Sequence, residues 1–403
     1  MFESLRSVMR FRRIEWNAAK RRLARCANVE DLREVSRRRL PRGVFGYIDG
    51  AAEDEVTCAR NCAAFERLEF RPRVLRGVGD VDPGTTLLGR PLPFPLVIAP
   101  TGFTRIAHPA GELAVARAAA RAGVPYSLST LATRSLEEVA AVSEGPRWFQ
   151  VYMWRDRGLV KELVQRAAAA GYEALLLTVD TAVAGRRERD LRSGFTLPPK
   201  LGLDTLIDGA LHPGWTLDFV RAEPILFANV AGHGDRDGTD AVALADYLNS
   251  QFDPGLDWSD VEWLRSVWDG PIVLKGIQTV EDAVLAAEAG IEAVALSNHG
   301  GRQLDGAPPP LELVGPVVER VGDQTEVICD GGVRRGSDIV KAMALGARAC
   351  MAGRAFLYGL GAAGEPGVER VLEWFDEGVR RTLTLVGARS FEELNENWVH
   401  WRS

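Results

Sequence analysis

From about residue 96 onward, short apolar runs alternate with longer segments whose apolar positions recur at helical spacing. Each run ends in a polar residue or a glycine turn before the next amphipathic segment begins. Eight such runs occur, at 95–101, 125–130, 148–154, 174–180, 271–276, 293–298, 326–332 and 349–354. Runs that are short and continuously apolar predict strands buried on both faces.

The segments between the runs predict helices, several of which end at a glycine suited to the left-handed position after a helix. They lie at 111–123, 135–142, 159–171, 257–268, 279–290, 310–322 and 336–346. Buried strands alternating with helices specify a parallel sheet, and eight such units close into a barrel. The predicted fold class is therefore α/β, a (β/α)8 TIM barrel with an N-terminal helical extension and a long insertion after the fourth strand.

Two regions do not follow the repeat. The first 75 or so residues predict helices at 29–39, 43–52 and 55–65, and the sequence at 85–95 predicts a hairpin across the barrel floor. The stretch at 191–257 is too long for an ordinary connection, which indicates a functional or mobile segment.

These boundaries predict three parts of the chain. A helical arm and cap spans 1–75, a barrel that includes the insertion spans 76–390, and a short tail spans 391–403.

Composition agrees with a globular protein, because 46% of the 403 residues are hydrophobic and 26% are charged. The five cysteines show no zinc-site spacing, so we expect reduced thiols and no metal. No apolar run approaches the roughly 18 to 20 residues of a membrane-spanning helix, which favours a cytoplasmic location.

The net charge of −6 argues against general nucleic-acid binding, yet residues 1–42 carry 13 Lys and Arg against 5 Asp and Glu. Basic clusters at Arg10 to Arg13, Lys20 to Arg22 and Arg37 to Arg39 could hold an anionic membrane surface or another subunit. A solvated helical arm is the favoured interpretation.

The chemistry of a (β/α)8 barrel sits at the C-terminal ends of its strands, and here these ends carry many polar groups. In strand order they are Ala99, Pro100 and Thr101; Ser129; Gln150 and Tyr152; Thr178 and Asp180; Lys275; Ser297 and His299; Asp330, Gly331, Gly332 and Arg334; Gly353 and Arg354. Each has an ordinary capping or turn explanation, but together they indicate one site. The glycine and arginine residues after the last two strands indicate a phosphate group.

Several motifs resemble the FMN-dependent L-2-hydroxy-acid dehydrogenases and oxidases, which include L-lactate dehydrogenase, glycolate oxidase and mandelate dehydrogenase. SNHGGRQLD at 297–305 is the most specific of them. The others lie at 98–102, 148–152, 177–180, 185–190, 274–276, 330–342 and 353–360. The resemblance extends from about Val29 to Val386 and is strongest to bacterial respiratory L-lactate dehydrogenases.

The resemblance implies that His299 is the catalytic base and that Asp180 orients its ring. Lys275 would stabilise the reduced flavin. Arg187 and Arg302 would bind the substrate carboxylate, since planar guanidinium groups suit bidentate contacts.

Tyr152 would bind the substrate hydroxyl or carboxylate. At the place of a further substrate-binding tyrosine of the family, in the helix at 43–52, the sequence presents Phe45. Tyr47 is close by but is expected to point to another face.

FMN is the implied cofactor, with no dinucleotide-binding or haem domain. The implied FMN-binding residues are Ala99, Pro100, Thr101, Ser129, Gln150, Thr178, Lys275, Ser297, Asp330, Gly331, Gly332, Arg334, Gly353 and Arg354.

The predicted reaction is oxidation of L-lactate to pyruvate, with a quinone or cytochrome as electron acceptor. An oxygen-using oxidase and an enzyme for a bulkier acid such as mandelate are the alternatives. The segment at 211–230, with Trp215, Phe219 and Phe227, is either a lid, which we favour, or a contact with the inner face of the plasma membrane. Family members suggest a homotetramer.

Two hypotheses from other classes remain open. A non-catalytic FMN-binding subunit would not lose its flavin absorbance with substrate in the absence of air. A phosphate-binding isomerase or aldolase barrel would purify without colour.

Overall fold

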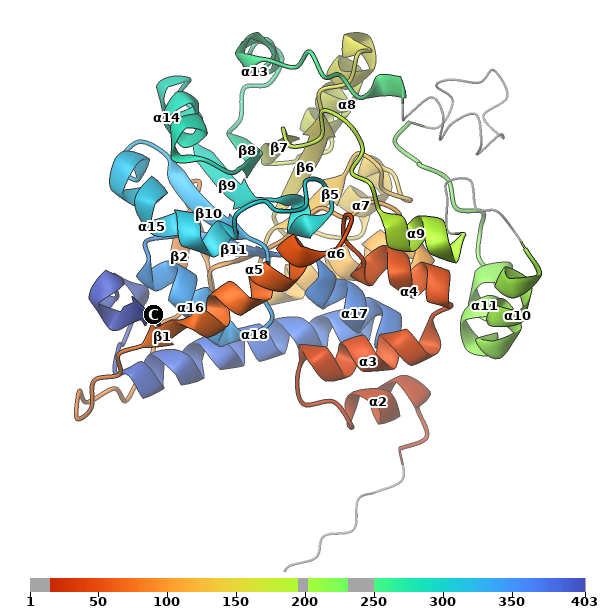
Figure 1. Cartoon of the computed structure of the whole chain (residues 1–403), viewed down its shortest axis with the longest axis horizontal. Coiled ribbons are helices and arrows are strands. Elements are labelled where there is room, and N and C mark those ends of the chain that lie inside the picture. The colour runs from red at the N-terminus through yellow and green to blue at the C-terminus, as the bar shows by residue number, and fades with distance from the viewer. Residues whose placement is uncertain (1–14, 195–201, 231–249, 403) are drawn as a thin grey trace, which may run out of the picture.

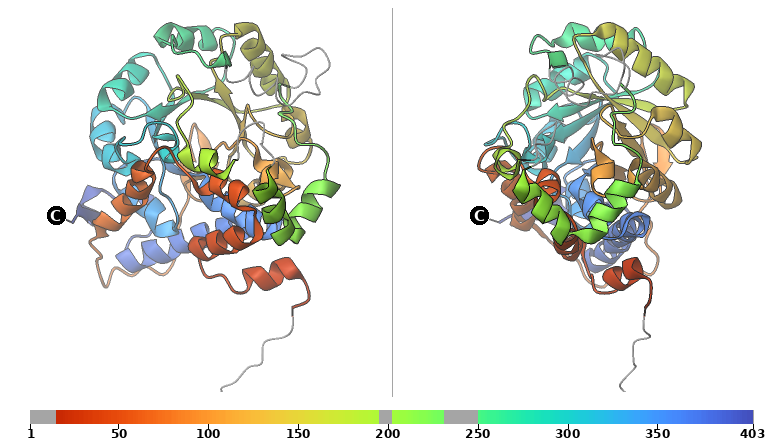
Figure 2. Two further views of the ribbon diagram at one scale, coloured as in Figure 1. Left: turned by 45° about the vertical axis from the view of Figure 1, so that its right-hand side comes forward. Right: turned by 90° about the vertical axis from the view of Figure 1, so that its right-hand side faces the viewer.

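A computed structural model describes residues 15–194, 202–230 and 250–402. Within these residues, eight parallel strands form a closed barrel surrounded by helices, which confirms the predicted fold (Figure 1 and Figure 2). The barrel strands are β4 (Leu96–Ile98), β5 (Tyr126–Ser129), β6 (Arg147–Tyr152), β7 (Ala174–Thr178), β8 (Ile272–Ile277), β9 (Ala293–Ser297), β10 (Glu326–Asp330) and β11 (Ala349–Ala352). Each predicted apolar run coincides with one of them, although β6 begins one residue before its run and β8 ends one residue after its run.

The helices of the repeat also lie where the sequence predicts them. They are α6 (Gly111–Ala122), α7 (Leu136–Ala141), α8 (Arg157–Ala169), α13 (Trp258–Arg265), α14 (Val280–Glu288), α15 (Pro310–Val321) and α16 (Gly336–Ala344). Local signals set their ends: a capping box of Ser135 and Glu138 begins α7, and Gly123 in the left-handed conformation ends α6.

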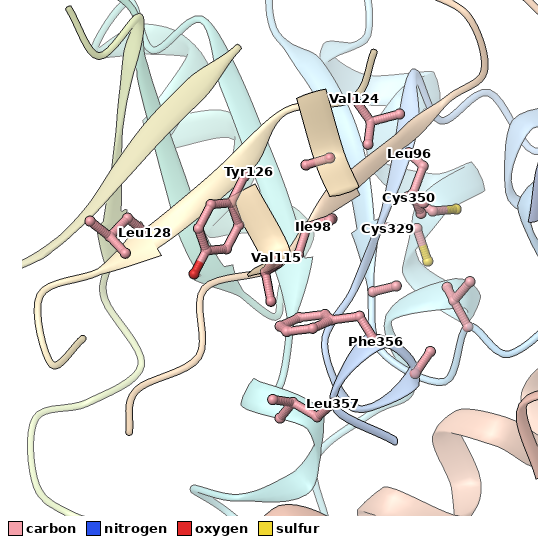
Figure 3. Close-up of a cluster of buried hydrophobic side chains, with 14 of the residues drawn as sticks. Leu96, Ile98, Val115, Val124, Tyr126, Leu128, Cys329, Cys350, Phe356 and Leu357 are labelled. Atoms are coloured by element: carbon pink, nitrogen blue, oxygen red, sulfur yellow. The ribbon is translucent and has the colours of Figure 1, made fainter. Parts of the chain in front are cut away.

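Side chains along most barrel strands alternate between two apolar clusters. Leu96 and Ile98 point outward into the layer between strands and helices, where Phe356 also packs (Figure 3). Val97, between them, belongs to the cluster inside the barrel. This alternation is the two-residue period of a strand, and it explains why the runs are apolar throughout.

The predicted hairpin closes the N-terminal end of the barrel. It consists of β2 (Thr85–Leu87) and β3 (Arg90–Leu92), which pair antiparallel. Leu87 and Leu92 are buried in the interior cluster together with Val97 and Trp148. The open end is therefore the opposite one, where the strands end.

In its described part, the N-terminal extension contains four helices: α2 (Ala18–Leu23), α3 (Val29–Arg39), α4 (Arg42–Asp49) and α5 (Val56–Arg67). In Figure 1, α2 and α3 lie at the bottom of the molecule and α5 crosses its front. Two arginines of the basic clusters contact the end of a barrel helix. Arg22 donates to the carbonyl oxygen of Ala362, and Arg39 donates to that of Gly361. Part of the basic surplus thus has a structural use, and the cluster at Arg10 to Arg13 lies outside the described residues.

Some elements were not predicted. Two helices follow the last barrel strand, α17 (Arg354–Ala363) and α18 (Glu365–Val386). A small antiparallel sheet joins β1 (Leu68–Phe70) to β12 (Val399–Trp401), so the predicted cap and tail are directly paired. The short 3-10 turns are η1 (Thr104–Ile106), η2 (His299–Gly301), η3 (Phe391–Glu393) and η4 (Glu396–Trp398).

Short helices α9 (Glu188–Ser193), α10 (Leu203–Leu211) and α11 (Pro213–Arg221) lie at the start of the insertion and within its described part. Positions 195–201 and 231–249 of the predicted insertion lie outside the described residues. No helix in the described ranges is both long and apolar enough to cross a bilayer.

Candidate active site

His299 and Asp180 meet at the open end of the barrel. His299 begins η2 directly after β9, and Asp180 follows the end of β7. The Nδ1 atom of His299 lies 3.0 Å from Oδ1 of Asp180. Gly276 gives this pair its space, because a Cβ atom there would lie 2.8 Å from the Asp180 side chain. When Nδ1 carries the proton that bonds Asp180, Nε2 of the neutral ring carries a free lone pair.

The surroundings set the charge of both partners. Burial and the positive charge of Lys275 lower the pKa of His299 below its ordinary value, although Asp180 acts in the opposite direction. Burial alone would raise the pKa of Asp180, but attraction to His299 and Lys275 lowers it. A neutral imidazole beside an ionised carboxylate is therefore the dominant state near neutral pH, and this arrangement can accept a proton.

Lys275 provides a second charged group, deep in the same end of the barrel. Its Nζ atom lies 3.1 Å from Oγ of Ser297 and 3.0 Å from Oδ2 of Asp330. Burial would lower the pKa of Lys275, but the negative charges of Asp330 and Asp180 raise it. The ammonium group therefore stays charged although its side chain is only 5% exposed.

Arg302 and Arg187 add two positive charges at the mouth. The Nη1 atom of Arg302 donates to the carbonyl oxygens of Tyr47 at 2.7 Å and Gly50 at 2.8 Å. Burial, together with the neighbouring charge of Arg187, lowers the pKa of Arg302 to about 10, so it remains protonated at pH 7. Two guanidinium groups that repel each other beside a pocket favour an anion between them.

These groups surround a pocket of about 480 Å³, within the size range of small-molecule sites. The sequence-predicted residues that line it are His299, Lys275, Tyr152, Arg187, Arg302, Ala99, Pro100, Thr101, Ser129, Gln150, Thr178, Asp330, Gly331, Gly332, Arg334, Gly353 and Arg354. Ser297 and Asp180 lie behind the lining and contact it through Lys275 and His299.

Phe45 is not at the pocket, contrary to the sequence-based expectation. Its ring stacks on Tyr358 with 6.5 Å between the ring centres, and the guanidinium carbon of Arg33 lies 5.9 Å from its centre. Tyr47 lines the pocket instead, with its ring centre 5.0 Å from the guanidinium carbon of Arg302. Two steps along a helix turn a side chain by about 200°, so only one of the two rings can face the site. Choosing between them required knowing which face of α4 packs against α17.

The pocket wall also includes the apolar side chains of Leu131 and Phe252, which the sequence did not indicate, and that of Phe227, which it indicated only as part of the aromatic segment. The ring of Phe252 meets that of Tyr152 edge to face, with 5.5 Å between ring centres. Phe227 and Phe252 belong to the long insertion, whose position after a strand end was the available signal.

The aromatic segment of the insertion is attached to the barrel loops. Trp215 donates from Nε1 to the carbonyl oxygen of Ile106 at 2.8 Å and stacks on Phe219, away from the lining of the pocket. Arg105 donates to the carbonyl oxygens of Glu223 and Pro224. Whether the segment acts as a lid stays a prediction.

The barrel, the imidazole–carboxylate pair and the cluster of fixed positive charges define an α/β-barrel enzyme that acts on an anionic small molecule. Residues 36–401 match the family model of FMN-dependent dehydrogenase. The chain belongs to this family.

Individual relatives agree with the family assignment. The L-lactate dehydrogenase of Caulobacter vibrioides is 43% identical over 92% of this chain and 96% of its own. The L-lactate oxidase of Nostoc sp. is 42% identical over 93% of this chain and 98% of its own. Among solved structures, the monotopic membrane protein (S)-mandelate dehydrogenase superposes with a TM-score of 0.90 at 40% identity, covering 94% of this chain and 100% of the other.

The pocket fits the FMN that this family uses. Gln150 presents a buried Nε2 atom that has no hydrogen-bond partner within the described residues, while its Oε1 atom accepts from Ser129. A buried amide donor of this kind needs an acceptor, and the polar edge of a flavin ring offers several. The glycine pair Gly331 and Gly332, with φ of 135° and 83°, brings bare main chain to the pocket close to Arg334.

Proposed function

We propose that this protein oxidises an L-2-hydroxy acid, with L-lactate to pyruvate as the leading reaction, and passes the electrons to a quinone or cytochrome. The observation that carries the proposal is the meeting of the His299–Asp180 pair with Arg187 and Arg302 at one pocket. A base and an anion clamp together suit a substrate that has a carboxylate next to the carbon that reacts.

In this proposal His299 handles the proton. Conversion of a 2-hydroxy acid to a 2-oxo acid removes two electrons and two protons, and Nε2 of His299 accepts the proton of the hydroxyl group. Asp180 holds the ring and stabilises the imidazolium that forms. FMN, when bound, would supply the oxidant, accepting the hydrogen of the reacting carbon together with its two electrons. A positioned base of this kind contributes about 10² to 10⁴ in rate.

Arg187 and Arg302 bind the substrate carboxylate. This contact fixes which face of the reacting carbon would be turned toward FMN. Tyr152 and Tyr47, which also line the pocket, complete the contact. Burial raises the pKa of Tyr152, which therefore remains a neutral hydroxyl donor. Lys275, held by Asp330, supplies a fixed positive charge where the flavin gains electrons.

The remaining strand-end residues hold FMN in this proposal. Around the ring and ribityl chain we place Ala99, Pro100, Thr101, Ser129, Gln150, Thr178 and Ser297, and toward the phosphate Asp330, Gly331, Gly332, Arg334, Gly353 and Arg354. Arg354 also bridges the carbonyl oxygens of Gly300 and Gly50, so it would serve both the cofactor and the loop of His299.

A bulkier substrate such as mandelate is the second candidate. The apolar wall formed by Leu131, Phe227 and Phe252 favours it, because an aromatic side chain gains contact area against such a surface. The similarity to a mandelate dehydrogenase points the same way. Oxygen is the alternative electron acceptor, as the similarity to an L-lactate oxidase suggests.

Peripheral contact with the inner face of the plasma membrane is the third part of the proposal. The helices α10 and α11 expose Leu203 (78%), Leu206 (61%), Ile207 (58%), Leu211 (68%) and Val220 (74%). These two helices lie at one edge of the molecule, near the basic helix α3 (Figure 1). An ion pair between Asp218 and Arg39 joins α11 to α3. An apolar face beside exposed arginines suits an anionic bilayer, and a homotetramer would present several such faces at once.

A panel of L-2-hydroxy acids tests the reaction. Flavin absorbance is followed without air, and the reduced protein is then mixed with oxygen or with a soluble quinone. Bleaching by L-lactate and reoxidation by quinone are the expected results. A coloured protein that no 2-hydroxy acid bleaches would reject the proposal.

A further inference from the structure

The loop that carries His299 is joined to the N-terminal extension by a pair of buried amides. Asn61 lies on α5 and Asn298 immediately precedes His299; their side chains are 2% and 1% exposed. Nδ2 of Asn61 donates to Oδ1 of Asn298 at 2.8 Å, and Nδ2 of Asn298 donates to Oδ1 of Asn61 at 2.8 Å. Each amide therefore fixes the orientation of the other.

The amide of Asn298 has every hydrogen-bonding position in use. Its Oδ1 atom also accepts from the main-chain N–H of Gly301 at 3.0 Å, and its Nδ2 group also donates to the carbonyl oxygen of Pro308 at 3.0 Å. A rotated or displaced amide would leave buried polar groups without partners, which is unfavourable. The turn is thus closed by a side chain whose orientation depends on Asn61.

The turn needs this support because His299 has a left-handed main chain. Its φ angle is 57°, in a strained region that non-glycine residues seldom adopt. The same turn places Nδ1 of His299 at 3.0 Å from Asp180. A relaxed turn would move the ring away from the carboxylate.

Helix α5 is also joined to the far end of the loop and to the glycine pair of the pocket. The carboxylate of Asp305 accepts from the main-chain N–H of Thr57 at 2.8 Å. The hydroxyl oxygen of Thr57 accepts from the main-chain N–H of Gly306 at 2.7 Å. On the other side, a Cβ atom at Gly332 would lie 2.1 Å from the carbonyl oxygen of Asn61. Asn61 therefore lies between the loop of His299 and the main chain proposed to hold FMN.

We propose that Asn61 is a positioning residue for His299: by pairing with Asn298 it holds the loop in the turn that keeps the imidazole against Asp180 and facing the pocket. Asn61 is not among the residues that line the pocket and acts through Asn298. The inference rests on the proposed function, since it assumes that His299 is the base.

A purely structural role would have a different signature. If the amide pair only stabilised the packing of α5, its loss would lower the melting temperature and leave the chemistry of the folded enzyme unchanged. The test therefore compares Asn61→Leu, which removes both hydrogen bonds, and Asn61→Asp, which keeps an acceptor for Asn298, with Phe65→Leu. Phe65 is a core residue of the same helix, 2% exposed, and its replacement destabilises α5 without touching the amide pair.

The holoenzyme of each variant is mixed with L-lactate, or the best substrate of the panel, without air. Asn61→Leu should lower the limiting rate of flavin reduction about 10- to 100-fold, as small misplacements of a catalytic group do. The limiting rate of flavin reduction in Asn61→Asp should lie between the rates of Asn61→Leu and wild type. Apparent substrate affinity should stay within about threefold, because Arg302 is anchored separately to Tyr47 and Gly50.

Two further readouts separate positioning from stability. The acid limb of the pH–rate profile should move to lower pH in Asn61→Leu, since His299 loses the carboxylate that raises its pKa. Amide hydrogen exchange across 298–307 should become faster in Asn61→Leu and stay unchanged in Phe65→Leu. Normal reduction rates in Asn61→Leu, or a rate loss in Phe65→Leu of the same size, would overturn the inference. Failure of wild type to reduce its flavin with any acid would instead reject the proposed function.

Discussion

Asp180 Oδ1 and His299 Nδ1 lie 3.0 Å apart although 119 positions separate the two residues along the chain. Each follows a different strand of the barrel, and the parallel sheet brings both strand ends to the same rim. The bond determines which nitrogen of the imidazole faces the pocket.

Replacing that carboxylate should slow the chemistry and leave cofactor binding intact. We expect Asp180→Asn to lower the limiting rate of flavin reduction by about 10² to 10⁴, because an amide neither fixes the required tautomer nor stabilises the imidazolium. His299→Gln should bind FMN and scarcely reduce it. Anaerobic stopped-flow absorbance measures both, and a normal rate in His299→Gln would remove the histidine from the mechanism.

The pH profile should report the lowered pKa of His299. The base form is needed, so kcat/KM should be high at neutral pH and fall as the pH drops below the ordinary histidine pKa of about 6.5. Asp180→Asn removes the charge that raises this pKa and should move the acid limb to lower pH. Lys275→Met removes a charge that lowers it and should move the limb to higher pH. Shifts in the same direction would contradict the electrostatic assignment.

The two arginines should differ in their effect on stability. Charge-assisted hydrogen bonds contribute about 1.5 to 3 kcal/mol each, so Arg187→Met and Arg302→Met should raise KM for the hydroxy acid about 10- to 100-fold or more. Arg187 has a buried Nε atom without a partner in the described residues, and its loss should not lower the melting temperature. Arg302 donates to two carbonyl oxygens, so the Arg302→Met variant should have a lower melting temperature than wild type. Unchanged KM values would place the carboxylate elsewhere.

Asp49 should contribute to stability in a pH-dependent way. It is buried on α4 and contacts Arg33, Arg189 and the hydroxyl of Tyr358. These contacts join the N-terminal helices to α9 and α17. Burial would raise the pKa of Asp49, but these partners lower it to about 2 from an ordinary 3.8.

A depressed pKa means that the contribution of Asp49 is full above about pH 4 and is lost as the pH falls toward 2. The size of the shift corresponds to about 2 kcal/mol. Asp49→Asn should lower the free energy of unfolding by at least this amount at pH 7, measured by urea titration. The difference from wild type should shrink at acid pH; a constant difference would contradict the linkage.

Membrane association should depend on the exposed face of α10 and α11. The double variant Leu206→Lys with Ile207→Lys should reduce flotation with phosphatidylglycerol vesicles about tenfold or more, because each buried apolar side chain contributes roughly 1.5 to 3 kcal/mol. Leu385→Lys is the control, since Leu385 is 69% exposed on α18, remote in sequence from the insertion. Flavin reduction should be normal in both, and equal flotation of all variants would reject this surface.

The barrel could be predicted because its signal is local. The strand that ends at Thr178, for example, is a continuous apolar run. Helix α7 begins at its own capping box. Polar residues at the strand ends then had to share one rim. The pairing of β1 with β12 gave no such signal, because three-residue strands at opposite ends of a chain have no detectable period.

The sequence by itself determined the eightfold alternation of strands and helices and, from it, the gathering of His299, Asp180 and Lys275 at one end, since hydrophobic period and chain order are enough to specify both. Arg187 and Arg302 were assigned to the same site through the resemblance of their motifs to the family. Only the tertiary structure decided that Tyr47 rather than Phe45 faces the pocket and that Asn61 supports the turn of His299. Those outcomes depend on how a helix is rotated against its neighbours, and that rotation is set by packing among residues far apart in the chain.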